Sequence, residues 1–320
     1  MFEVSDSDNN TRGQLFLLTS YMKSGNTWVR LFINQILRKR DNKNDLDINN
    51  FNVGNMSSSR IWIENILGIG LGELSHDEID NLRPLAYSIA TKKLTSSLYM
   101  KVHDAYSHTE KGQPLFPTHS VKGVLYIVRN PLDVATSLAH HSAKDLSDTI
   151  TNLNDHNHSL CGSLTSLDSQ LRQKVFSWSE HVESWLTQTQ IPVYCVRYED
   201  MKHDSFNIFR SIAHFLDLPY DKKSIEYAIE TCSFKNLQQQ EKDNGFKEKP
   251  SKAEFFFRKG IVGDWQNHLN EEQKDRIIEA HGKLMLQLGY LDSSGQPCVR
   301  HSSYLDTLNN RIISKNKIKG

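Results

Sequence analysis

The chain carries Gln14-Leu15-Phe16-Leu17-Leu18-Thr19-Ser20-Tyr21-Met22-Lys23-Ser24-Gly25-Asn26-Thr27-Trp28 near its amino end. Residues 14–19 form a short apolar run of strand length, and residues 23–25 form a lysine-serine-glycine turn. Bulky side chains then recur at helical spacing, namely Trp28, Leu31, Phe32, Gln35 and Ile36. The order strand, loop, helix predicts the first unit of an α/β fold.

The same kinds of element return twice further along the chain. Residues 123–128 predict a second strand, after which Asn130 can cap a helix and Pro131 suits its first position. Residues 192–197 predict a third strand, which follows an amphipathic helix. Strands that alternate with helices predict an α/β domain with a mostly parallel central sheet flanked by helices.

We expect a single domain over residues 1–298, followed by a polar, basic tail over residues 299–320 with no clear role. Ligands in a parallel sheet bind beyond the carboxyl ends of the strands. Three side chains from separate motifs would converge at that edge: Lys23, Arg129 and Tyr198.

Other segments predict the surroundings of such a site. Residues 58–67 and 75–94 have helical patterns, the second beginning with a capping box, and could form the wall of a substrate pocket. Residues 142–176 are rich in Ser, Asn, Asp and His, which predicts a long loop or lid, with a plain surface insertion as the alternative. Residues 270–288 predict a helix that Gly289 can terminate.

Composition excludes several classes of protein. The 38 basic residues balance the 38 acidic ones, so no overall field attracts nucleic acid or an anionic membrane. No apolar run of about 18 residues and no signal-peptide pattern is present, so we expect no membrane association. Four cysteines without a C-x-x-C pair argue against a zinc site or a disulfide framework and favour a reducing, cytoplasmic location.

The turn after the first strand predicts an anion site. Free backbone N–H groups of Ser24, Gly25, Asn26 and Thr27 would point at one spot at a helix N-terminus, where Lys23 adds a charge. The Walker A pattern is absent, because the lysine precedes the glycine. An ordinary glycine turn is the alternative explanation.

The second strand ends at Arg129, where a magnesium-dependent phosphotransferase would commonly offer a carboxylate. A guanidinium group beside a helix N-terminus suggests a second phosphate, to which Ser137 could add a hydroxyl donor. A surface ion pair between Arg129 and Asp133 is the alternative.

Residues 98–103 predict a strand that places Lys101 and His103 on one face. A histidine is suited to removing a hydroxyl proton near neutral pH, and a lysine beside it could stabilise a leaving group. His140 and His141 are rival bases, and a structural role is the alternative for each of the 14 histidines.

Residues 255–265 combine aromatic side chains, adjacent cations and two glycines, which predicts a loop over a nucleotide phosphate. A nucleic-acid patch is the competing interpretation, and the zero net charge argues against it.

Taken together, these strings resemble the sulfotransferase family that uses 3′-phosphoadenosine 5′-phosphosulfate (PAPS). Residues 21–28 resemble its 5′-phosphosulfate loop, residues 126–137 its 3′-phosphate motif, and residues 258–265 its carboxyl-terminal loop. The resemblance runs from about residue 14 to residue 290. It implies the P-loop-kinase-like sulfotransferase architecture and, as product, 3′-phosphoadenosine 5′-phosphate (PAP).

The resemblance also implies roles for individual residues. The 5′-phosphosulfate would be held by Lys23, Ser24, Gly25, Asn26 and Thr27. The adenine would contact Trp28, Tyr198 and Phe234. The 3′-phosphate would be bound by Arg129, Ser137, Arg258, Lys259 and Gly260, and we place Phe257 beside them in the donor site. Departures from the family pattern occur at Met22, Asn26 and Cys232, and residues 266–275 lack the dimer motif of many animal members, so the oligomeric state stays open.

The resulting hypothesis is in-line sulfuryl transfer without a metal. His103 would deprotonate a hydroxyl of a small-molecule acceptor, while Lys23 and Lys101 neutralise charge on the leaving phosphate. Residues 51–97 and 142–176 would shape the acceptor pocket. A P-loop-like nucleotide-dependent kinase and a catalytically inactive nucleotide-binding module are the alternatives.

Overall fold

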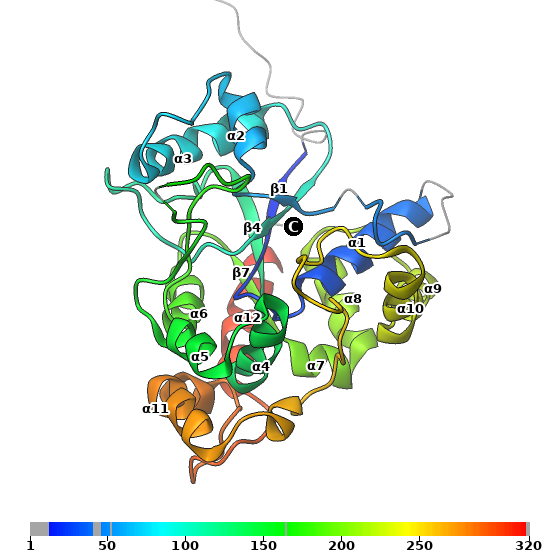
Figure 1. Cartoon of the computed structure of the whole chain (residues 1–320). Coiled ribbons are helices and arrows are strands. Elements are labelled where there is room, and N and C mark those ends of the chain that lie inside the picture. The colour runs from blue at the N-terminus through cyan, green and yellow to red at the C-terminus, as the bar shows by residue number, and fades with distance from the viewer. Residues whose placement is uncertain (1–12, 41–45, 52, 164, 318–320) are drawn as a thin grey trace, which may run out of the picture.

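The chain is described here from a computed structural model, which covers residues 13–40, 46–51, 53–163 and 165–317. Within these ranges lies a five-stranded parallel sheet with the strand order β2-β3-β1-β4-β7 (Figure 1). Its strands are β1 (Leu15–Ser20), β2 (Asn55–Met56), β3 (Leu98–Val102), β4 (Val121–Val128) and β7 (Val193–Arg197). A separate antiparallel pair joins β5 (Ser159–Leu160) to β6 (Gln173–Lys174). The predicted parallel α/β sheet is confirmed.

Helices connect the parallel strands and cover both faces of the sheet. They are α1 (Asn26–Arg40), α2 (Arg60–Leu67), α3 (His76–Lys92), α4 (Pro131–Ser142), α5 (Leu146–Asn154), α6 (Trp178–Thr187), α7 (Tyr198–His203), α8 (Ser205–Phe215), α9 (Lys222–Thr231), α10 (Phe234–Asn244), the 3₁₀ turn η1 (Asp264–Asn267), α11 (Glu271–Gln287) and α12 (Ser303–Lys317). None of the helices in the described ranges is long and apolar enough to span a bilayer.

Alternate side chains of the strands enter two separate cores. Leu15 and Leu17 of β1 pack with α3, α4, α6 and α11, whereas Phe16 and Leu18 pack with α1, α8 and α9. Figure 1 shows these two groups of helices on opposite sides of the sheet. Because both faces are covered, the strands are apolar throughout, as parallel strands usually are.

Local signals fix several helix ends as predicted. The Ser75 hydroxyl accepts from the Glu78 amide and the Glu78 carboxylate accepts from Ser75, which completes the capping box of α3. The Asn130 side chain caps α4, whose first residue is Pro131. Gly289 follows α11 with a φ of 77°, in the left-handed region that a glycine accepts without strain.

Two segments contain more structure than the sequence indicates. The stretch expected as a loop over residues 142–176 contains α5, β5 and β6, because Asp145 caps α5 and the side chains of Ile150 and Leu153 are buried. A role for this stretch as a lid stays a prediction. The expected tail contains α12, which packs Leu305 into the core beside β7.

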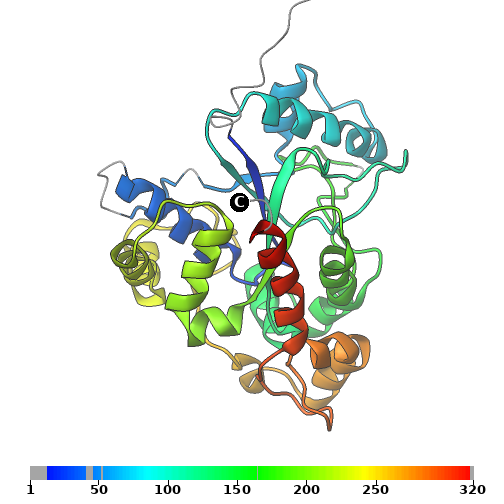
Figure 2. The same cartoon turned by 180° about the vertical axis from the view of Figure 1, so that it is seen from behind.

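The edge strand β7 is covered by α12, which Figure 2 shows running beside the sheet. The Asn309 side chain accepts from the Cys195 N–H at 3.0 Å and donates to the Cys195 carbonyl at 2.9 Å. One side-chain amide therefore satisfies both backbone groups of a residue at the edge of the sheet.

Candidate active site

A cavity of about 860 Å³ receives residues from the carboxyl ends of all five strands of the parallel sheet. Its wall includes nearly all the residues that the sequence predicts for the site: Lys23, Gly25, Asn26, Thr27, Trp28, Lys101, His103, Arg129, Ser137, Tyr198, Phe234, Phe257, Arg258, Lys259 and Gly260. Ser24 is fully buried and is not part of the wall. Motifs separated by more than two hundred residues thus meet in one cavity.

The loop between β1 and α1 has a backbone shaped for an anion. Lys23 and Gly25 have positive φ angles of 63° and 107°, so the chain turns sharply just before α1 begins. A Cβ atom at position 25 would lie 2.8 Å from the Tyr198 ring, which explains the glycine. The Asn26 side chain donates inward to the Leu18 carbonyl at 2.8 Å. Its backbone amide is therefore the group that Asn26 could offer to an anion.

Lys23 is partly buried and lies among other cations. Its ammonium group lies 4.2 Å from the centre of the Phe256 ring and 3.2 Å from Nδ1 of His141. Burial, together with the charges of Arg129 and Lys101, lowers the pKa of Lys23 to about 7. An anion in the cavity would restore its charge.

Arg129 joins three parts of the site. Its guanidinium lies 4.4 Å from the centre of the Tyr198 ring and donates to the carbonyls of Lys23 and Ile261, each at 3.1 Å. The alternative partner Asp133 is 3.7 Å away, and its carboxylate accepts backbone N–H bonds from residues 263 and 265. Asp133 therefore holds the carboxyl-terminal loop and is only a distant partner of Arg129.

The loop over residues 257–264 carries the remaining cations. Arg258 and Lys259 both form ion pairs with Asp264, the second at 2.7 Å. Although burial raises the pKa of Asp264, the hydrogen bonds from Lys259 and Arg258 hold it below its usual range. Gly260 has a φ of 61°, and a Cβ there would lie 2.3 Å from the Phe234 ring. Sequence reasoning missed Asp264 as the partner of these cations, although it lies within residues 258–265.

His103 has a defined protonation pattern. Its Nδ1 lies 2.8 Å from the Ser20 carbonyl, which can only accept, so Nδ1 carries the proton and Nε2 is free to accept one. Burial and the nearby charge of Lys101 lower the pKa of His103 to about 3, so the ring is neutral at pH 7. Behind it, His181 Nε2 donates to the His103 carbonyl at 3.1 Å, and Tyr126 donates to His181 Nδ1 at 2.7 Å.

Lys101 faces an acidic side chain that sequence reasoning missed. Glu248 lies 3.5 Å from the Lys101 ammonium and accepts two hydrogen bonds from Arg30, at 3.0 and 2.8 Å. Burial, with the charge of Arg30, lowers the pKa of Lys101 to about 8. Burial disfavours the charged Glu248 carboxylate, but the bonds from Arg30 and the charge of Lys101 lower its pKa to about 2. No local pattern links these residues, because Glu248 lies 147 positions after Lys101 and 218 positions after Arg30.

Two polar atoms on side chains of the cavity wall are unsatisfied. Trp28 Nε1 and Arg129 Nε are buried without a hydrogen-bond partner among the residues that the structure describes. Both can donate, and they accompany a concentration of lysine and arginine, which fits a ligand with at least two phosphate or sulfate groups. Within the described ranges, no group of three or more His, Cys, Asp or Glu side chains could hold a metal ion.

A family model described as the sulfotransferase domain matches residues 14–289. The chain belongs to the sulfotransferase family. Its members are PAPS-dependent transferases, so the protein is an enzyme of this type and PAPS is its sulfuryl donor. The family predicted from the sequence is thereby confirmed.

Relatives and solved structures agree with this assignment. Cytosolic sulfotransferase 15 of Arabidopsis thaliana is 32% identical over 164 residues, which cover 48% of this chain and 44% of that relative. Sulfotransferase 1B1 of Mus musculus is 26% identical over 294 residues, which cover 89% of this chain and 86% of that relative. The crystal structure of mouse sulfotransferase SULT7A1 complexed with PAP has a TM-score of 0.56 at 20% identity and covers 94% and 89% of the two chains. This likeness shows that the fold is shared.

Proposed function

We propose that this sulfotransferase moves the sulfuryl group of PAPS to a hydroxyl of a small-molecule acceptor, with His103 as general base. The observation that carries the proposal is the hydrogen bond from His103 Nδ1 to the Ser20 carbonyl. Ser20 is the last residue of β1, just before the anion loop. The bond therefore ties the base to the loop that would hold the donor.

The donor-binding roles rest on the shape and charge of the cavity. Lys23 and the loop amides would bind the 5′ end, and Arg129, Ser137, Arg258 and Lys259 the 3′-phosphate. Trp28 and Tyr198, whose ring centres lie 6.0 Å apart, and Phe234 would contact the adenine. PAPS supplies the reactive sulfuryl group when bound.

The residues of this chain would then promote a single displacement reaction at the sulfur atom. His103 Nε2 takes the hydroxyl proton, and the acceptor oxygen bonds to sulfur while the bond from sulfur to the phosphate oxygen breaks. Lys23 and Lys101 stabilise the charge that develops on that oxygen. The products are the sulfated acceptor and PAP, and no redox change occurs.

The decisive test is a screen of hydroxyl compounds with ³⁵S-labelled PAPS, together with calorimetric titration of PAP. Label transfer to a hydroxyl compound, with PAP bound at one site per chain, supports the proposal. Failure to bind PAP, or turnover of ATP with Mg²⁺ in its place, contradicts it. Relatives named cytosolic sulfotransferases support a further proposal, that the protein acts in the cytoplasm.

A further inference from the structure

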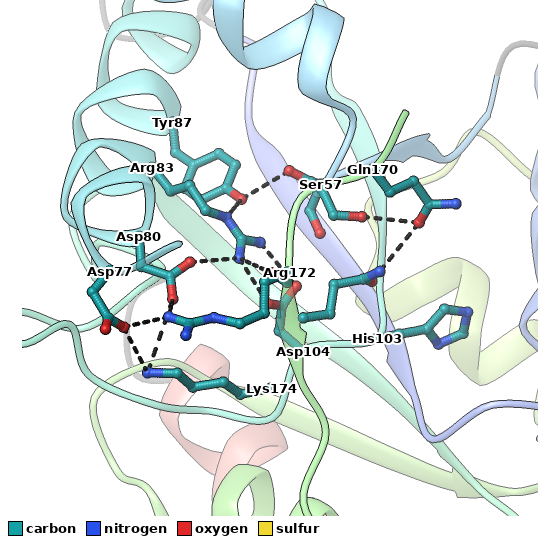
Figure 3. Close-up of polar contacts among 12 residues, drawn as sticks. Ser57, Asp77, Asp80, Arg83, Tyr87, His103, Asp104, Gln170, Arg172 and Lys174 are labelled. Carbon is teal, nitrogen blue, oxygen red and sulfur yellow. Dashed lines mark hydrogen bonds and ion pairs between the residues drawn. The ribbon is translucent and has the colours of Figure 1, made fainter. Parts of the chain in front are cut away.

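Two glutamines form part of the cavity wall and lie outside the segments that we propose bind the donor. We call Gln170 and Gln173 the amide pair. Figure 3 shows the Gln170 amide and the His103 imidazole on the same side of the ion-pair network around Arg83 and Arg172. The amide pair therefore belongs to the part of the cavity where an acceptor would meet the base.

Hydrogen bonds fix the orientation of both amides. Gln170 Oε1 accepts from Ser58 Oγ at 3.2 Å and from Gln173 Nε2 at 3.1 Å. With two donors on its oxygen, Gln170 keeps its NH₂ group as a donor for another partner. Gln173 uses its NH₂ on Gln170, and its Oε1 is buried without a partner among the described residues. The pair thus offers one donor and one unsatisfied acceptor.

The backbone that carries the amide pair is held from three sides. Arg172, between the two glutamines, forms ion pairs with Asp77 and Asp80 of α3 (Figure 3). Its carbonyl accepts from Arg83 at 3.1 Å. The Leu171 N–H donates to the Ser58 carbonyl at 2.7 Å. The amides are therefore pre-positioned before an acceptor binds.

The far end of the same segment is tied to the chain next to the base. The Lys174 carbonyl accepts from the Ala105 N–H at 2.8 Å, two residues after His103. Arg83 also forms two hydrogen bonds with Asp104, at 2.8 and 2.9 Å. The distance between the amide pair and His103 is thus set by rigid contacts.

We propose that the amide pair selects acceptors that carry a second hydroxyl group besides the one that is sulfated. This inference rests on the proposed function. A hydroxyl both donates and accepts, so one such group can satisfy Gln173 Oε1 and receive the Gln170 N–H bond. A hydrogen or methyl group in its place leaves both amides unsatisfied. The chemical class is therefore the diols and polyols, whether aromatic or aliphatic.

Matched probes test the inference directly. Catechol is compared with phenol, and cis-cyclohexane-1,2-diol with cyclohexanol, by kcat/KM with labelled PAPS. We expect a preference of about tenfold or more for each diol. In Gln170→Met and Gln173→Met, the preference should fall several-fold, mainly through a higher KM for the diol, while PAP affinity is unchanged. Gln287→Met, at an exposed position of α11, serves as the matched control.

The possible results distinguish failure of the diol preference from failure of the proposed sulfuryl transfer. Equal rates for both members of each pair overturn the diol preference and leave sulfuryl transfer intact. A preference that survives both glutamine variants, or transfer to none of the four probes by protein that binds PAP, also overturns it. Loss of PAP binding in the wild-type protein would contradict the proposed function itself.

Discussion

Single side chains in the site have pKa values that differ from those in water. His103 is neutral and oriented by one carbonyl, while Lys23 and Lys101 are partly buried and have lowered pKa values. A neutral base beside cations can accept a proton without first losing one.

Replacement of His103 by alanine should reduce kcat by about 10²- to 10⁴-fold, because the transition state loses its proton acceptor. PAP affinity should stay close to that of the wild type, since the loop amides and Arg129 remain. Turnover is measured with labelled PAPS, and His203→Ala, at an exposed position, is the control. Near-normal turnover by the folded His103 variant would exclude it as the base.

Replacement of Arg129 by alanine should weaken PAP binding by about 10-fold or more, because a charge-assisted contact to the 3′-phosphate is lost. Adenosine 5′-phosphate lacks that group, so its affinity should change much less. Titration calorimetry gives both dissociation constants, and Arg210→Ala, on the exposed surface, is the control. An equal loss for the two nucleotides would refute the 3′-phosphate role and indicate a general effect on the loop.

PAP affinity should fall as the pH rises above about 7. Free Lys23 loses its proton near that pH, whereas the bound anion raises its pKa, so binding at higher pH requires proton uptake. Calorimetry in buffers of different ionisation enthalpy measures this uptake, and the dissociation constant should rise up to about tenfold per pH unit. Lys23→Met should flatten the slope, whereas Lys235→Met, an exposed control, should keep it. A pH-independent affinity between pH 7 and 9 would argue against a lowered Lys23 pKa.

Among the elements, α3 and the end of β3 are joined by a buried ion pair. The side chains of Arg83 and Asp104 are almost completely buried, 0% and 1% exposed. The charge of Asp104 favours protonated Arg83, so its pKa lies well above the usual value despite burial. Because Asp104 follows His103 directly, this pair also holds the backbone that carries the proposed base.

Arg83→Met alone should lower the free energy of unfolding by about 3–5 kcal/mol, because it leaves the buried Asp104 carboxylate without its partner. The double variant Arg83→Met/Asp104→Leu should recover much of that loss, since both charges are removed while Asp80 keeps Arg172. Urea unfolding of the single and double variants measures the coupling. A single variant within about 1 kcal/mol of wild type would show that the pair contributes little.

The sequence predicted the elements that depend on local pattern. The apolar runs of β1, β4 and β7 and the capping box at Ser75 are visible within a few residues. Pairings such as Arg30 with Glu248 were not predictable, because partners 218 residues apart leave no periodic signal. Helix α12 was missed because its apolar residues are sparse and it is stabilised by contact with β7.

At the scale of the whole molecule, the site is assembled from nearly the entire chain. Lys23 lies after β1, Arg129 after β4, Tyr198 after β7, and Arg258 in the loop before α11. The sheet therefore positions the residues that we propose bind the donor, and a global loss of structure must separate them. The binding site and the fold should unfold together.

PAP should consequently stabilise the entire domain. At a free concentration 100 times its dissociation constant, a ligand that binds only the folded state adds about 2.7 kcal/mol to the free energy of unfolding. We expect a midpoint shift of several degrees by calorimetry, with the transition remaining single. Arg129→Ala should show a smaller shift at the same PAP concentration. An unchanged midpoint at saturating PAP would contradict this linkage.

The amide of Asn309 has a consequence for synthesis of the chain. It lies 114 residues after Cys195, whose backbone it satisfies at the edge of the sheet. At roughly 5–20 residues per second, the ribosome takes roughly 6–23 seconds to make the intervening segment. During that interval the edge of β7 is an open template for a strand from another nascent chain. Protection against aggregation therefore begins only when α12 has emerged and docked.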